Sequence, residues 1–69
     1  MRLKDIKIGE WYDTKAGTGV CEQVGGVHPP AVKIRITWPI PFGTRWVAPR
    51  DVERQLTAGE VDTLRGRAF

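Results

Sequence analysis

The chain has 69 residues, of which 41% are hydrophobic and 28% are charged, a composition that suits one small globular domain and excludes both a membrane span and a disordered tail. Its single cysteine and single histidine exclude an internal disulfide, a cysteine-based zinc site and most metal or acid–base sites. The net charge is +3. No apolar run approaches a membrane-spanning helix of about 20 residues and no signal-peptide core follows Met1, so we expect a cytoplasmic protein that binds no membrane. We also expect that the protein uses no cofactor.

Short β-rich runs separated by glycine and proline predict an all-β domain with five strands. The segment 5–12 reads as a lead-in and first strand. Residues 15–19 predict a turn, because two glycines supply the positive φ angles of a tight reversal. A second strand is expected at 18–24, with Val20 and Val24 on one face.

The clearest strand is predicted at residues 31–38, where apolar and polar side chains alternate. The prolines before it belong to a connection, because proline cannot donate to a strand ladder. One face of the strand is apolar and the other polar, which is typical of a half-buried antiparallel strand. The apolar set is Val32, Ile34, Ile36 and Trp38. Since Trp38 shares this face, we expect it in the core.

A proline-rich loop at 39–43 and a return strand at 44–48 follow. Phe42 in the loop either plugs the end of the domain or forms an exposed contact. Trp46 and Val47 are adjacent in the return strand, so their side chains point to opposite faces. We expect Val47 in the core and Trp46 on the surface.

A C-terminal helix is predicted from Thr57 onward. Thr57 and Glu60 have the spacing of a capping box, in which each side chain bonds the backbone N–H of the other residue. Val61 and Leu64 follow at helical spacing and need a surface to cover them. That surface is either the sheet of this chain or a binding partner, so Val61 and Leu64 are the candidate partner-binding residues.

A helical turn begun by proline is predicted at 49–52, before a last short strand at 53–56. Five short strands, a glycine-rich first turn and this helical turn resemble the SH3-like barrels, nearest to the KOW, Tudor and CarD-type set. The resemblance implies an all-β, five-stranded SH3-like barrel over residues 1–56, with 57–69 as a short helix packed on the barrel or on a partner. Barrels of this shape bind nucleic acids, ribosomal components, polymerase subunits and peptides, so the fold alone does not assign an activity. The matching segments are Ile8-Gly9-Glu10-Trp11-Tyr12, Gly17-Thr18-Gly19-Val20, Val32-Lys33-Ile34-Arg35 and Arg45-Trp46-Val47-Ala48-Pro49-Arg50-Asp51-Val52.

The basic excess falls in the second half of the chain. Residues 1–30 balance to zero and residues 31–69 carry the whole +3, and all but one of the cations there are arginines, which suit bidentate contact with phosphate. Interleaved with aromatic residues, they favour a surface for DNA or RNA that neutralises phosphates and stacks bases. The candidate contact residues are Lys33, Arg35, Phe42, Arg45, Trp46, Arg50 and Arg54.

A protein-interaction module is the alternative function. In that case the C-terminal helix, or the surface of Trp46 and Phe42, docks on a partner in a larger bacterial or bacteriophage assembly. Nucleic-acid binding requires the cations to converge on one face, whereas a protein-interaction module does not. A net charge of +3 also fits an ordinary protein surface.

Cys21 could act as a nucleophile only with His28 as its base, and a small buried cysteine is far commoner. We therefore expect no enzyme and no catalytic or metal-binding residue.

Overall fold

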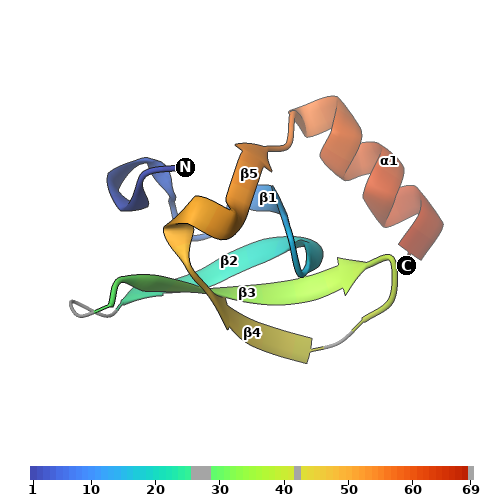
Figure 1. Cartoon of the computed structure of the whole chain (residues 1–69). Helices are drawn as coiled ribbons and strands as arrows, with labels where there is room; N and C mark the ends of the chain where they lie inside the picture. The colour runs from blue at the N-terminus through green and yellow to red at the C-terminus, as the bar shows by residue number, and fades with distance from the viewer. Residues whose placement is uncertain (26–28, 42, 69) are drawn as a thin grey trace.

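The computed structural model describes residues 1–25, 29–41 and 43–68 of the chain. In these residues, two 3-10 turns, five strands and one helix follow one another along the chain (Figure 1). The strands form one antiparallel sheet with the order β4-β3-β2-β1-β5. The elements are a 3-10 turn at Leu3–Asp5, β1 at Trp11–Thr14, β2 at Gly17–Gly25, β3 at Ala31–Trp38, β4 at Gly43–Val47, a second 3-10 turn at Pro49–Asp51, β5 at Val52–Gln55 and the helix α1 at Ala58–Ala68.

The sheet is open, with β4 and β5 as its two edge strands. Each inner strand pairs with both of its neighbours, whereas no ladder joins β4 to β5 among the described residues. The prediction of an all-β fold with a short C-terminal helix is confirmed, but the predicted barrel is not closed. None of the described helices has the length and apolarity that a membrane crossing requires.

The centre of the core is the apolar face of β3. Val32, Ile34 and Ile36 have no exposed surface. They lie on one face because side chains alternate along a strand, and β2 and β4 cover both flanks of β3. The bounds predicted for this strand are confirmed. The core is completed by Ile6, Tyr12, Cys21, Val47 and Val52.

Trp38 is not part of this core, which corrects the prediction from its alternation with Ile36. Its side chain is 39% exposed. Trp38 is the last residue of β3, so it extends beyond the layer of buried side chains toward α1. The strand pattern therefore gives its face correctly but not its burial.

Val20 and Val24 do not share a face, again in contrast to the prediction. Val20 pairs with Arg35 on the outer face of β3, whereas Val24 pairs with the buried Val32. The cause is an irregularity of the ladder between Cys21 and Gln23, which shifts the alternation by one residue. Strand β2 therefore changes its inward positions partway along its length.

The first turn is shorter than predicted and contains only two residues, Lys15 and Ala16, between β1 and β2. Gly17 begins β2 with a φ of 135°, a value that glycine adopts without strain. Gly19 lies within β2 rather than in the turn. There the backbone of β3 comes so close that a Cβ atom on Gly19 would be 1.9 Å from the carbonyl oxygen of Arg35.

Candidate functional site

The outer face of β3 and β4 carries an exposed aromatic side chain with a cation beside it. In the β3–β4 ladder Lys33 pairs with Trp46 and Arg35 pairs with Thr44, so these side chains lie on the same face. Trp46 is 55% exposed, whereas Val47 is buried in the core. The predictions that Trp46 lies on the surface and Val47 in the core are confirmed.

Trp46 lies against the sheet and borders a hollow. A Cβ atom on Gly25 of β2 would be 3.6 Å from Cη2 of the indole, so the ring extends over that strand. The hollow of about 460 Å³ is lined by Trp46 and Arg50, and by Pro29, Pro30, Ala31, Ala48 and Pro49. Among the residues that the structure describes, Lys33 and Arg50 form no ion pair. We call Trp46, Lys33 and Arg50 the Trp46 surface.

The other predicted contacts near β4 are placed differently. Arg35 shares the outer face, but its Nε donates to a carboxylate oxygen of Glu22 at 2.7 Å, so its charge is balanced locally. Arg45 pairs with Ile34 and therefore lies on the opposite, core-facing side of β4, where it is exposed at the sheet edge. Phe42 lies outside the described residues.

Arg54 lies on the far edge of the sheet, in an ion-pair network between β5 and α1. Its Nη1 donates to Oε1 of Glu60 at 2.8 Å and its Nη2 donates to Oε2, while Oδ2 of Asp13 is 3.0 Å from Nη2. The bond with Glu60 is the main reason that the pKa of Arg54 is raised. The predicted cations therefore do not share one face of the protein.

The same network lowers the pKa of Glu60 to about 2, first through the hydrogen bond from Arg54 and then through the backbone N–H of Thr57. That N–H donates to Oε1 of Glu60 at 2.9 Å, and the N–H of Glu60 donates to Oγ1 of Thr57 at 3.2 Å. Both bonds of the predicted capping box are confirmed. Glu60 thus caps α1 and ties it to the sheet.

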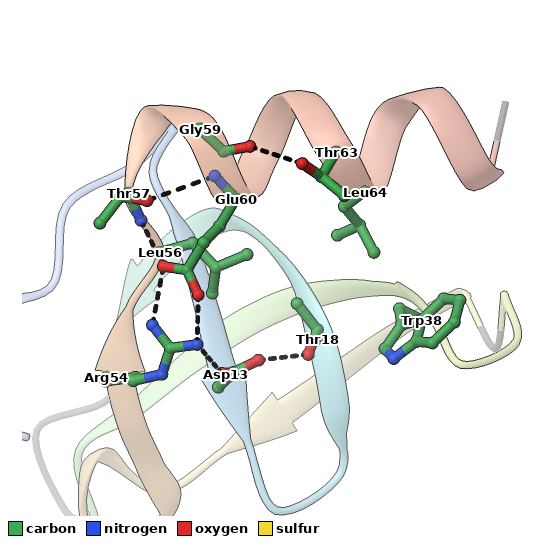
Figure 2. A pocket seen from close by; sticks show the side chains of 10 residues that line it. All are labelled: Asp13, Thr18, Trp38, Arg54, Leu56, Thr57, Gly59, Glu60, Thr63 and Leu64. Carbon is green, nitrogen blue, oxygen red and sulfur yellow. Dashed lines mark hydrogen bonds and ion pairs between the residues drawn. The ribbon is translucent and has the colours of Figure 1, made fainter.

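A cavity of about 640 Å³ lies between α1 and the sheet (Figure 2). Leu64 points into this space from the helix and is buried there, and Val61 on the same helix is only partly buried. The helix therefore packs on its own chain through Leu64. The lining residues are Asp13, Thr18, Trp38, Arg54, Leu56, Thr57, Gly59, Glu60, Thr63 and Leu64.

Two members of this site, Asp13 and Thr18, were not predicted from the sequence. Asp13 pairs with Arg54 in the β1–β5 ladder, and the hydroxyl of Thr18 donates to Oδ1 of Asp13. The only sequence signal is a carboxylate and an arginine on strands that become neighbours. Finding the pair requires the register of β1 and β5, which the local pattern of neither strand contains.

The described residues contain no group of three or more His, Cys, Asp and Glu side chains that could hold a metal ion. Cys21 is buried, and desolvation raises the pKa of its thiol, so the nucleophilic thiolate is disfavoured. His28, the base considered for it, lies outside the described residues. Comparison of the chain with protein-family models, curated proteins and solved structures found no match.

Proposed function

We propose that this protein is an SH3-like module, open between β4 and β5, that binds single-stranded nucleic acid through the Trp46 surface. The strand order and the 3-10 turn between β4 and β5 support the SH3-like topology. The binding proposal rests on one observation. An exposed indole lies against the sheet, with Lys33 opposite it in the ladder and Arg50 in the lining of the same hollow, and neither cation forms an ion pair with the described residues.

In this proposal each side chain contacts a different part of the nucleotide. The indole of Trp46 offers a face on which an unpaired base stacks, a contact that contributes about 1–3 kcal/mol per base. The hollow beside it, lined mainly by proline and alanine, receives the sugar or the edge of the base. Lys33 and Arg50 neutralise the flanking phosphates. A duplex hides the base faces, so single strands are the preferred ligand.

The experiment measures binding of fluorescently labelled oligo-dT and oligo-U at 50 mM salt by anisotropy. Trp46→Ala should weaken binding about 5- to 150-fold, which is the loss of one stacked base. Trp38→Ala is the matched control, because Trp38 is also exposed but lies in the cavity below α1. Equal binding by the Trp46→Ala variant, or no binding of either oligonucleotide, would refute the proposal.

The salt dependence gives a second readout. Two phosphate contacts on a single strand predict an affinity about sevenfold lower at 200 mM than at 50 mM salt, and Lys33→Ala or Arg50→Ala should halve the slope. Arg54→Ala is the control, because Arg54 is already paired with Glu60 and Asp13. An equal loss of slope in the Arg54→Ala variant would place the phosphates on the other edge of the sheet.

A protein-interaction role is the second candidate. The observation that favours it is the cavity below α1, which leaves the indole of Trp38 partly exposed next to the buried Leu64. This site lies apart from the Trp46 surface, since the two share no lining residue.

A further inference from the structure

The cavity below α1 has an apolar part and a charged part at different ends. Trp38 stands at one end, and Figure 2 shows the ion-pair network of Arg54 at the other. Leu56 and Leu64 point into the space between them. A guest that fills the cavity therefore needs an apolar segment several bonds long and one polar end.

The polar end of the cavity is negatively charged and presents acceptors. The carboxylates of Asp13 and Glu60 against the guanidinium of Arg54 leave a formal charge of −1. Two of the three threonines that line the cavity have already used their hydroxyl protons, because Thr18 donates to Asp13 and Thr63 donates to the carbonyl of Gly59. Their oxygens are left as acceptors. Such a site complements a cationic donor and disfavours an anion.

We propose that this cavity binds a lysine side chain of an extended peptide segment from a protein partner. The ammonium group of lysine has three donors and no acceptor, and its four methylene groups are an apolar stem. The stem lies along Trp38 and Leu64, and the ammonium reaches the carboxylate of Asp13. Lysine suits the site better than arginine because Arg54 already occupies the bidentate edge of Glu60.

The proposal is independent of nucleic-acid binding, since it uses none of the residues of the Trp46 surface. The probe is the blocked peptide Gly-Gly-Lys-Gly-Gly, titrated into the isotope-labelled full chain and followed by NMR. We expect millimolar binding that shifts the indole N–H of Trp38 and the methyl groups of Leu64 and leaves the indole of Trp46 unchanged. The same peptide with norleucine in place of lysine keeps the stem without the charge and should bind at least fivefold more weakly.

Two variants separate the charged end from the apolar end. Asp13→Asn removes one unit of negative charge and should weaken binding of the lysine peptide about fivefold, the effect of one charge at about 4 Å in water. Trp38→Ala should abolish the shifts of Leu64, and Trp46→Ala is its matched control with unchanged affinity. If Asp13→Asn disturbs the fold, the comparison of the lysine and norleucine peptides on the unchanged protein tests the charged end.

Three results would overturn the proposal. Equal affinity for the lysine and norleucine peptides would show that the cavity selects apolar chains without regard to charge. Shifts centred on Trp46, or tighter binding of a glutamate peptide, would place the guest elsewhere or reverse its charge. The absence of any shift at peptide concentrations well above the expected millimolar range would show that α1 closes the cavity to a peptide side chain.

Discussion

Replacing Gly19 with alanine should unfold much of this protein. A Cβ atom at this position would lie 1.9 Å from the carbonyl oxygen of Arg35 and 2.6 Å from its carbonyl carbon. Both atoms belong to the backbone of β3, so no side chain can rotate away. Relief of the clash requires β2 to move away from β3, and that movement breaks hydrogen bonds in the ladder with the strand that carries the centre of the core.

The magnitude follows from the two costs together. Overpacking alone costs about 1–3 kcal/mol, and each backbone hydrogen bond lost adds about 0.5–1.5 kcal/mol. A domain of this length has a free energy of unfolding of roughly 3–10 kcal/mol. The substitution therefore removes about 3 kcal/mol or more, which is comparable with the entire stability.

The assay is urea denaturation followed by circular dichroism. Gly25→Ala is the matched control on the same strand, because its Cβ would lie 3.6 Å from the Trp46 ring, an ordinary van der Waals distance. We expect the midpoint of the control to stay near that of the parent protein and the midpoint of Gly19→Ala to collapse. Similar midpoints for the two variants would refute the close approach of β2 and β3 at Gly19.

The remaining predictions concern the core, the helix and pH. Ile34→Ala should cost about 2–5 kcal/mol because Ile34 has no exposed surface, and an unchanged melting temperature would contradict that burial. Leu64→Asp should lower stability by about 1.5–3 kcal/mol through lost apolar burial and leave the chain monomeric by sedimentation, whereas unchanged stability with lost self-association would mean that Leu64 packs on a second copy. Glu60 has a folded pKa of about 2, below its ordinary 4.5, so its contribution to stability is complete above pH 4.5 and is lost as the pH falls toward 2. An acid titration of helix content should show a transition in that window that is absent in Glu60→Gln.

Local patterns predicted the elements that depend on local physics. Strand β3 was predicted with its bounds because its eight alternating residues lie between Pro30 on one side and Pro39 on the other. The capping box was predicted because it needs only two residues at fixed spacing. Val20 and Val24 were assigned wrongly because a ladder irregularity reverses the alternation, and nothing in the run of residues marks it.

The candidate site divides in the same way. The outward position of Trp46 follows from its neighbour Val47, and the same alternation already separates Arg45 from Trp46. The pairing of Arg54 with Asp13 and Glu60 depends on which strands become neighbours and on where α1 lies. A count of cations along the chain therefore overstated the charge that one face can present.

The position of Arg45 has a consequence for behaviour at high concentration. Strand β4 is an edge of an open sheet, and such edges invite a strand from another molecule to continue the ladder. Arg45 lies on the core-facing side of β4, so a strand added at this edge would have to cover a charged side chain that points inward. An inward-pointing charge of this kind opposes the addition of a strand at the β4 edge.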